Sequence, residues 1–482
     1  MDIVALLEAL VNDLLKAEAS FFENPKEFSE LERAAKTSTE SFAASFLGLV
    51  LTEMNEKIYN NGWRKEKYIV QRTDMRTLIS SVGDISFNCS YFKRKTDGKY
   101  AYLLEEMIGV SRNERFTEEA EAALLCEAMK TSYAEAARVL PSKQEITKTT
   151  VMNKVHQIAE EIPYETTEKL KEAPYLFIEA DEDHVAEQHG KESEENKSFV
   201  SKLIYVYEMS KPVEGNENRK ELVNKFYFGG LYAGAQANRK LWNNVQDYID
   251  KTYDTDKLKR VFISGDGAGW IKSSVDYLDN ALFCADKFHL MKYINRAAAQ
   301  MLDEKEDVKD ELWHLLYSKK PKAKERFDEY TSRMIASADN PKSIEELRTY
   351  VLGNWAAVRR TLRNKLVNGC SAEGHVSHVL SDRLSSRPMG WSQTGADRMS
   401  KLRCYERNYG REKIIDLVKY SREQRLLERT GTDDVPVKAL TLKEILAEHY
   451  NQSRSYIDRM QATIPGFTVK KILAITQHVN EI

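Results

Sequence analysis

Acidic side chains follow two apolar segments that have the composition of buried β-strands. Asp266 comes after the apolar run 261–263, and Asp181 comes after the run 175–178. A carboxylate at the end of a buried strand is held in place but still faces solvent, where open α/β sheets bind ligands. Asp266 also precedes a predicted helix, so its alternative role is an N-cap that accepts a backbone hydrogen bond. The residues around Asp266 alone leave both roles open.

Asp181 belongs to a dense acidic cluster, Glu-Ala-Asp-Glu-Asp-His, over residues 179–184. A solvated acidic loop is the alternative interpretation of the cluster, and Asp183 is the alternative first acid. The end of the apolar strand favours Asp181. Two carboxylates a few ångströms apart repel each other unless a divalent cation lies between them, and oxygen ligands suit Mg²⁺ or Mn²⁺. We therefore predict that Asp181 and Asp266 share a metal site.

The elements predicted between residues 173 and 289 position these acids. They come in the order strand, strand, strand, helix, strand, helix and strand. The second and third strands are predicted over 199–210 and 224–234, joined by a polar turn rich in Gly and Asn. This is the order of a ribonuclease-H-like (RNase H-like) fold, in which an antiparallel meander precedes parallel strands separated by helices. In such a fold Asp181 and Asp266 end adjacent central strands.

A third acid follows a long helical segment. Residues 290–367 have apolar side chains at helical spacing throughout, which predicts an all-helical insertion. Glu373 lies beyond it, near the start of a further helix, where it either complements the helix dipole or supplies a third metal ligand. His375 and His378 come next, but no cysteine stands at ligand spacing, so zinc is not favoured.

Three segments of different periodicity precede the predicted core. Residues 1–60 have the apolar spacing of helices that pack or pair with another subunit. Residues 67–104 are rich in β-branched and aromatic side chains, which predicts a small antiparallel meander. Residues 114–160 form short helices around a turn at Pro141, the layout of a helix-turn-helix, although many three-helix packings share it. The residues predicted to contact DNA from its last helix are Thr147, Lys148, Thr149, Asn153 and Lys154.

The composition sets the broad class. The chain has 482 residues, of which 42% are hydrophobic, enough for several globular domains. Five scattered cysteines without a CxxC pair indicate neither a disulfide framework nor a zinc knuckle. The N-terminus lacks signal-peptide features and no apolar run is long enough to cross a bilayer, so we expect a cytoplasmic protein without a membrane partner. The net charge is −3, yet residues 355–411 hold eleven Lys and Arg against four acids, a surface suited to phosphates.

Four segments resemble one family, the DDE transposases of bacterial insertion sequences, and most closely the ISLre-type transposases related to the Mutator-like group. They are YLFIEADEDHV (Tyr175–Val185), ISGDGAGWIK (Ile263–Lys272), CADKFHLMKYI (Cys284–Ile294) and Ser371–Arg403 with its core SSRPMGW. The resemblance extends over most of 65–410. The Mutator-like group has a C/D-x-x-H signature after the second acid, which Asp286 and His289 match here.

The resemblance implies a set of site residues. The catalytic and metal-binding acids would be Asp181, Asp266 and Glu373, with His289, Asp286 and Asp183 in support. Arg383 and Arg387 would contact phosphates of a bound DNA end.

The resemblance also implies an activity. It is DNA cleavage and strand transfer at the terminal inverted repeats of an insertion sequence, with two Mg²⁺ (or Mn²⁺) ions. The partners would be double-stranded DNA ends and target DNA. Two ends must be processed together, so at least a dimer is expected, in the bacterial cytoplasm at the nucleoid.

The predicted fold class is α/β: an RNase H-like catalytic core interrupted by an all-helical insertion, preceded by a helical and β-meander region with a helix-turn-helix. The predicted division is an N-terminal helical region (1–66), a β meander (67–108), a helix-turn-helix-like domain (109–170), the first part of the core (171–294), the helical insertion (295–367), the last part of the core (368–410) and a helical C-terminal region (411–482). Alternative functions are a catalytically inactive or domesticated DNA-binding protein and a plain metal-dependent DNA nuclease.

Overall fold

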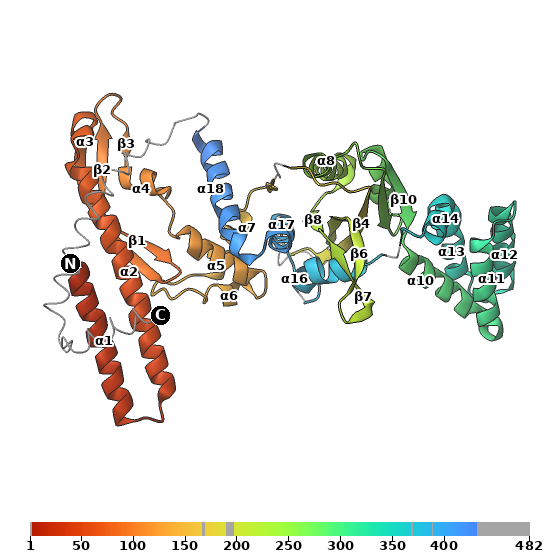
Figure 1. Ribbon diagram of the computed structural model, residues 1–482, viewed down its shortest axis with the longest axis horizontal. Helices are drawn as coiled ribbons and strands as arrows, with labels where there is room; N and C mark the ends of the chain where they lie inside the picture. Colours follow the sequence, from red (N-terminus) through yellow and green to blue (C-terminus); the bar gives the residue numbers. More distant parts are fainter. Residues whose placement is uncertain (1, 166–168, 189–196, 368–369, 388, 431–482) are drawn as a thin grey trace. The chain divides into compact units, whose positions relative to one another are not determined.

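The chain forms two compact units in a computed structural model that describes residues 2–165, 169–188, 197–367, 370–387 and 389–430 (Figure 1). Among the described residues, the first unit joins 2–154 with 418–430, and the second unit lies within 155–417. The predicted division into seven segments is finer than this and stays a prediction. Within the described residues, no helix combines the length and the apolar character that a membrane span needs.

The first unit is built on a small antiparallel sheet, as the sequence pattern predicts. Helices α1 (Ile3–Glu23) and α2 (Phe28–Asn60) pack against each other, and α2 also packs on strand β2. The sheet has the order β1-β2-β3 and comprises β1 (Tyr68–Ser80), β2 (Gly83–Arg94) and β3 (Tyr100–Ala101). Ile85, Phe87 and Cys89 of β2 are buried in one hydrophobic core, because alternate side chains of a strand face the same side.

Short helices complete the first unit. They are α3 (Gly62–Lys67), α4 (Leu103–Ile108), α5 (Glu118–Ala128), α6 (Tyr133–Ala136), α7 (Lys148–His156) and α18 (Ile414–Thr430), and of the last two only residues 148–154 and 418–430 belong to this unit. Helix α7 begins at Lys148, directly after Thr147. The hydroxyl of Thr147 accepts a hydrogen bond from the backbone N–H of Thr150 at 3.2 Å, which is how a threonine caps a helix.

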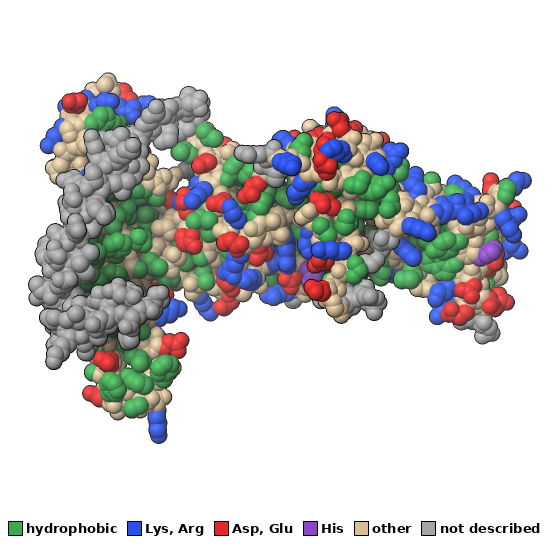
Figure 2. Space-filling view, in the orientation of Figure 1, with side chains coloured by type: hydrophobic (Ala, Val, Ile, Leu, Met, Phe, Trp, Pro, Cys, Tyr) green, Lys and Arg blue, Asp and Glu red, His purple; other side chains and the backbone are tan. Residues whose placement is uncertain are grey.

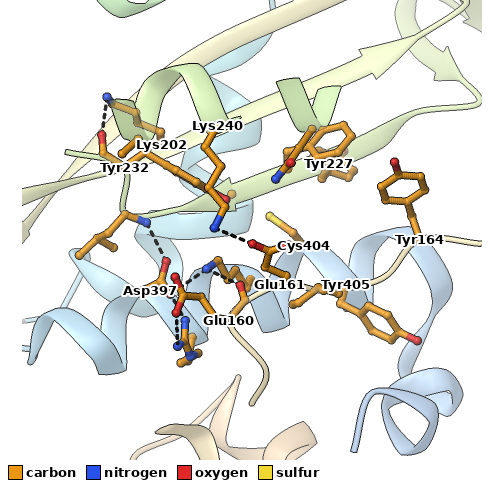
Figure 3. A pocket seen from close by; sticks show the side chains of 18 of the residues that line it. Glu160, Glu161, Tyr164, Lys202, Tyr227, Tyr232, Lys240, Asp397, Cys404 and Tyr405 are labelled. Carbon is orange, nitrogen blue, oxygen red and sulfur yellow. Dashed lines mark hydrogen bonds and ion pairs between the residues drawn. The ribbon is translucent and has the colours of Figure 1, made fainter. Parts of the chain in front are cut away.

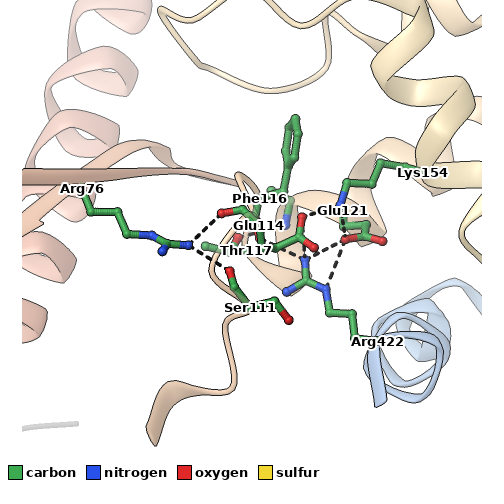
Figure 4. A network of polar contacts seen from close by, with 9 residues as sticks. Arg76, Ser111, Glu114, Phe116, Thr117, Glu121, Lys154 and Arg422 are labelled. Atoms are coloured by element: carbon green, nitrogen blue, oxygen red, sulfur yellow. Dashed lines mark hydrogen bonds and ion pairs between the residues drawn. The ribbon is translucent and has the colours of Figure 1, made fainter. Parts of the chain in front are cut away.

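A cluster of buried ion pairs holds these helices together (Figure 4). The ammonium of Lys154 bonds to Glu114 and lies 3.0 Å from the carboxylate of Glu121. The guanidinium of Arg422, from α18, lies 2.7 Å from the same Glu121 oxygen. Lys154 is only 7% exposed. Its charge is neutralised inside the unit, which does not favour the predicted contact of Lys154 with DNA, and that contact stays a prediction.

The second unit contains a five-stranded mixed sheet in the order β10-β9-β4-β5-β8. Its strands are β4 (Tyr175–Ala186), β5 (Ser198–Tyr207), β8 (Phe226–Gly230), β9 (Arg260–Gly265) and β10 (Ala281–Ala285). Strands β4, β9 and β10 run parallel, whereas β5 is antiparallel to both β4 and β8. The expected mixture of a meander and parallel strands is present, so the chain is a mixed α/β protein.

A two-stranded ribbon replaces the polar turn predicted between β5 and β8. Strands β6 (Met209–Val213) and β7 (Asn216–Val223) pair with each other outside the main sheet. Helix α8 (Gly234–Thr252) then covers one face of the main sheet. Its side chains Leu241, Trp242, Val245 and Ile249 are buried at helical spacing against Ile178 and Ile263.

The predicted insertion is helical in the structure. It comprises α10 (Lys287–Ala298), α11 (Lys305–Tyr317), α12 (Ala323–Ser337), α13 (Lys342–Gly353) and α14 (Trp355–Arg363), and it follows the short helix α9 (Gly269–Lys272) and strand β10 (Figure 1).

The chain then returns to strand β4. Helix α15 (Ala372–Val376) continues through a π-helical turn (Ser377–Ser381) into α16 (Asp382–Leu384), and α17 (Gln393–Tyr409) follows. Helix α15 packs against β4. This segment brings the residues beyond the insertion back to the strand that carries Asp181.

Candidate active site

Three aspartates, Asp181, Asp266 and Asp286, lie where the parallel strands end, at the side of the sheet that we call the acidic edge. Glu179 pairs with Ser264 in the β4–β9 ladder, so two residues further on Asp181 lies alongside Asp266. Ala285 pairs with Gly265, and the N–H of Asp286 donates to the carbonyl of Gly265 at 2.9 Å. The register therefore places Asp181, Asp266 and Asp286 in a row across β4, β9 and β10.

The carboxyl group of Asp181 has a raised pKa. Its pKa is raised to about 6, mainly by burial and also by the negative charges of Asp266 and Asp286. The hydrogen bond from the N–H of Glu182, 2.9 Å from Oδ1, and the charge of His289 act in the opposite direction. A carboxylate that burial and like charges disfavour is characteristic of functional sites.

Asp286 and His289 form a pair beside this row. Oδ1 of Asp286 accepts the N–H of Phe288 at 2.8 Å, which caps helix α10, and Oδ2 lies 2.6 Å from Nδ1 of His289. The hydrogen bond to Asp286 is the main reason that the pKa of His289 is raised, with the charges of Asp286, Asp181 and Asp266 adding to it. His289 thus supplies positive charge to an otherwise acidic edge.

Asp266 shapes the turn before helix α9. Its Oδ1 accepts the N–H of Ala268 at 2.8 Å, and Gly267 has a φ of +94°, a conformation that suits glycine. The N-cap residue of α9 is Ala268, whose side chain makes no capping bond. Asp266 is therefore not the N-cap residue of α9. Its carboxylate instead accepts a hydrogen bond within the turn just before the helix.

Glu373 lies in the first turn of α15, with its side chain exposed. Among the described residues, no hydrogen bond or ion pair links Glu373 to Asp181, Asp266 or Asp286. No three His, Cys, Asp or Glu sidechains of the described part of the chain are grouped closely enough to hold a metal ion. The role of Glu373 as third acid stays a prediction.

Asp183, the alternative first acid, is engaged elsewhere. It is buried, and the hydroxyl of Ser385 lies 2.9 Å from each of its carboxylate oxygens. Burial raises the pKa of Asp183, while the hydrogen bonds of Ser385 and Ser381 oppose that shift. This favours Asp181 over Asp183 as the acid that faces Asp266.

The predicted DNA-contacting residues separate into exposed and buried groups. Those that are exposed are Thr147, Lys148, Thr149, Asn153 and Arg387. Arg383 is 3% exposed, and its guanidinium lies 4.6 Å from the centre of the Trp391 ring. Its charged group packs inside the second unit, which does not favour the predicted contact of Arg383 with a DNA phosphate, and that contact stays a prediction. On the face in Figure 2, basic and acidic side chains are interspersed, consistent with the small net charge.

Sequence reasoning missed a cavity of about 830 Å³ in the second unit (Figure 3). It is lined by β8, α8 and α17 and by Glu182, which alternation along β4 directs to the opposite face from Asp181. Charged side chains in its wall are paired with one another: Lys240 lies 2.6 Å from Glu161, and Lys401 lies 2.9 Å from Asp397. This balance distinguishes the cavity from the acidic edge, which we take as the candidate site.

Sequence reasoning also missed Glu179. This carboxylate is 2% exposed and accepts hydrogen bonds from Tyr205, Tyr207 and Ser371. The available signal was an acid inside the apolar run LFIEA, where a buried charge needs partners.

The fold and the acidic edge define a mixed α/β protein with a cluster of aspartates at the ends of its parallel strands. The chain belongs to the uncharacterised protein family UPF0236, whose model matches residues 22–420. One family member, from Caldanaerobacter subterraneus subsp. tengcongensis, is 34% identical over 402 residues, which are 83% of this chain and 80% of that protein. Another from the same organism is 32% identical over 384 residues, covering 79% of this chain and 78% of the relative.

Among solved structures, a chain of the Drosophila P element transposase strand transfer complex aligns with this protein. The alignment covers 74% of this chain and 90% of the chain in that complex. The sequence identity is 12% and the TM-score is 0.20. A likeness of this size is too weak to define the fold.

Proposed function

We propose that this chain is a DDE-type transposase that cleaves DNA at the ends of an insertion sequence and joins them to target DNA. The observation that carries the proposal is the row formed by Asp181, Asp266 and Asp286 across three parallel strands, with His289 beside it. These four residues lie in three of the four segments that resemble the transposases.

The sheet supports an RNase H-like core. The order of the strands is β10-β9-β4-β5-β8, with an antiparallel meander on one side of β4 and two parallel strands on the other. The helical insertion follows β10, and the chain returns to β4 with α15. This is the connectivity that the sequence resemblance implies for a DDE transposase with an insertion before its third acid.

The donor set suits Mg²⁺ or Mn²⁺. A buried carboxylate repelled by two neighbouring acids is stabilised when a divalent cation binds. Mg²⁺ typically takes one or two carboxylates together with waters and substrate phosphates, so a preformed group of three protein ligands is not required. Asp181 and Asp266 would hold the ion or ions, with Glu373 joining them when DNA is bound. Bound metal would activate a water or a 3′-hydroxyl and stabilise the leaving oxygen.

This chain's own residues would then orient the reaction. His289, held by Asp286, would place a positive charge beside the scissile phosphate. The exposed side chains of α7 and Arg387 would bind the DNA backbone. No protein nucleophile is needed.

The names of the family members add support. The first relative's name joins eleven designations from one strain, and the second relative's name joins four. A product that occurs at many places in one genome fits a mobile element.

The test is cleavage of a duplex that contains the DNA flanking this gene. The wild-type chain is expected to nick it at the element end with Mg²⁺ and to join a precleaved end to a plasmid. Asp266→Asn should bind the duplex as well as the wild type does but cleave it at least about 100-fold more slowly. Loss of a residue that only supports a metal ligand already reduces activity about 10–100-fold.

The matched control is Asp276→Asn, an exposed aspartate of the same segment, which should cleave normally. Retained cleavage in Asp266→Asn would refute the site. Cleavage without joining would indicate a plain nuclease, and binding without cleavage by the wild type would indicate an inactive DNA-binding protein.

A further inference from the structure

We propose that Glu179 and Asp183 are positioning residues, which hold the helical segment 371–385 across Asp181. They lie two residues before and two residues after Asp181 on β4. Alternation along the strand puts all three side chains on one face, the face against which α15 packs. The catalytic part of this inference rests on the proposed function, whereas the contacts themselves do not.

Glu179 binds the start of the segment. The N–H of Ser371 donates to Oε2 of Glu179 at 2.6 Å, and the Ser371 hydroxyl lies 3.1 Å from the same oxygen. Ser371 is the N-cap residue of α15. The hydroxyls of Tyr205 and Tyr207, from β5, also donate to the Glu179 carboxylate. Four donors therefore converge on one buried carboxylate and fix where the helix begins.

Asp183 binds the end of the segment. The Ser385 hydroxyl lies 2.9 Å from both oxygens of Asp183, and Ser385 is the residue that follows α16. A few residues further on, the N–H of Trp391 donates to the carbonyl of Ala186 at 3.0 Å, so the chain stays attached to the end of β4. The two acids thus hold opposite ends of one helical segment.

The middle of the segment is a π-helical turn, Ser377–Ser381. Such turns are rare and occur often at functional sites. The buried guanidinium of Arg403, from α17, donates to the carbonyls of Val379 at 2.5 Å and His378 at 2.8 Å. These bonds stabilise the wide turn, so the segment is fixed at its centre as well as at its ends.

The arrangement places Asp181 between two fixed points. Glu373 is two residues from Ser371 in the chain. Glu179, which binds Ser371, is two residues from Asp181. The Glu179–Ser371 contact therefore sets the position of Glu373 relative to Asp181. When this contact is lost, the helix start is free to shift, and a third carboxylate on it no longer meets a metal held by Asp181.

The test uses Glu179→Gln in the full chain, which keeps the size of the side chain but turns one accepting oxygen into a donor that faces other donors. Hydrogen exchange of peptides within 370–387 should become about 10-fold faster or more than in the wild type. The Mg²⁺ concentration for half-maximal cleavage should rise about 10-fold, within the range for residues that support metal ligands. Binding of the end duplex should not change. A general structural defect would weaken this binding as well.

Two further variants make the test sharper. Ser385→Ala removes both bonds to Asp183 and should accelerate exchange at the end of the segment, whereas Ser385→Thr keeps the hydroxyl and should restore the wild-type rate. If Glu179→Gln fails to fold, the Ser385 pair decides the proposal. The matched control is His184→Gln, an exposed position of the same strand, which should exchange and cleave as the wild type does.

Unchanged exchange in Glu179→Gln and Ser385→Ala would overturn the proposal. If the wild-type chain cleaves, faster exchange in Glu179→Gln with an unaltered Mg²⁺ requirement would also overturn the proposal. A wild-type chain that never cleaves would refute the proposed function instead, and the exchange rates would then decide the positioning contacts alone.

Discussion

Each unit of the molecule contains a cluster of carboxylates, and the charges of the two clusters are balanced in opposite ways. In the first unit, burial works to raise the pKa of Glu114, but the charges of Lys154 and Arg422 outweigh it, so the pKa is lowered. In the second unit, burial and the charges of Asp266 and Asp286 raise the pKa of Asp181 to about 6. The same residue types are therefore stabilised as anions in one unit and destabilised in the other.

The difference lies in how the charges of the two clusters are compensated. Glu121 meets Lys154 at 3.0 Å and Arg422 at 2.7 Å, so the charges of the first cluster are balanced within the protein (Figure 4). At the acidic edge, His289 is bonded to Asp286, and the electrostatic repulsion between the aspartates remains. Binding of a cation, as proposed above, would relieve this repulsion.

The largest effect is expected from breaking the balanced cluster. Glu121→Gln would leave Lys154 and Arg422 without their shared carboxylate, and loss of one partner from a buried ion pair costs about 3–5 kcal/mol. The free energy of opening for α5, measured by native-state hydrogen exchange, should fall by that amount.

Its matched control is Glu135→Gln, whose partner Arg138 lies 3.0 Å away on the exposed surface. Exposed pairs of this kind contribute about 0–1 kcal/mol. Equal losses in the two variants would mean that the buried cluster does not stabilise the first unit.

A smaller effect of opposite sign is expected at the acidic edge. Asp181→Asn removes the repelled charge and should stabilise the second unit at pH 7. The shift from 3.8 to about 6 corresponds to about 3 kcal/mol, which partial solvent screening reduces to about 1–2 kcal/mol.

The pH dependence of this contribution follows from the sign of the shift. Because the folded-state pKa is raised, the protonated Asp181 contributes stability that is fully present below pH 4 and is lost as the pH rises through about 6. The wild type should lose this stability across that window in urea denaturation, and Asp181→Asn should not. A variant that unfolds more easily than the wild type at pH 7 would contradict the unbalanced charge.

The sequence was sufficient for the features that depend on local pattern. Apolar runs and their spacing predicted the strands that carry Asp181 and Asp266, the helical insertion and the meander. The match at Asp286 and His289 came from the resemblance, and the structure brings both residues beside the other two acids. Local pattern also misled at the β6–β7 ribbon, where polar residues that resemble a turn form a hairpin outside the core.

The rest depends on contacts between distant parts of the chain. Lys154 and Arg383 look like surface cations in sequence, yet Lys154 meets Glu121 and Arg383 packs on Trp391. The bond between Glu179 and Ser371 joins residues 192 positions apart. Periodicity gives the buried face of an element but not the partner that covers it, so these roles emerge only in the folded chain.

The smallest effect, and the most direct test of the comparison, is selective stabilisation by Mg²⁺. If the acidic edge takes the cation, Mg²⁺ at three times its dissociation constant should stabilise the second unit by about 0.8 kcal/mol. The first unit should not respond, because its carboxylates already have Lys154 and Arg422. Hydrogen exchange measures both in one sample, through peptides from β4 and from α5. Asp266→Asn should remove the response of β4, and NaCl at matched ionic strength should not reproduce it. Protection of α5 equal to that of β4 would show that Mg²⁺ acts on the surface charge of the whole protein, and the distinction between the two clusters would fail.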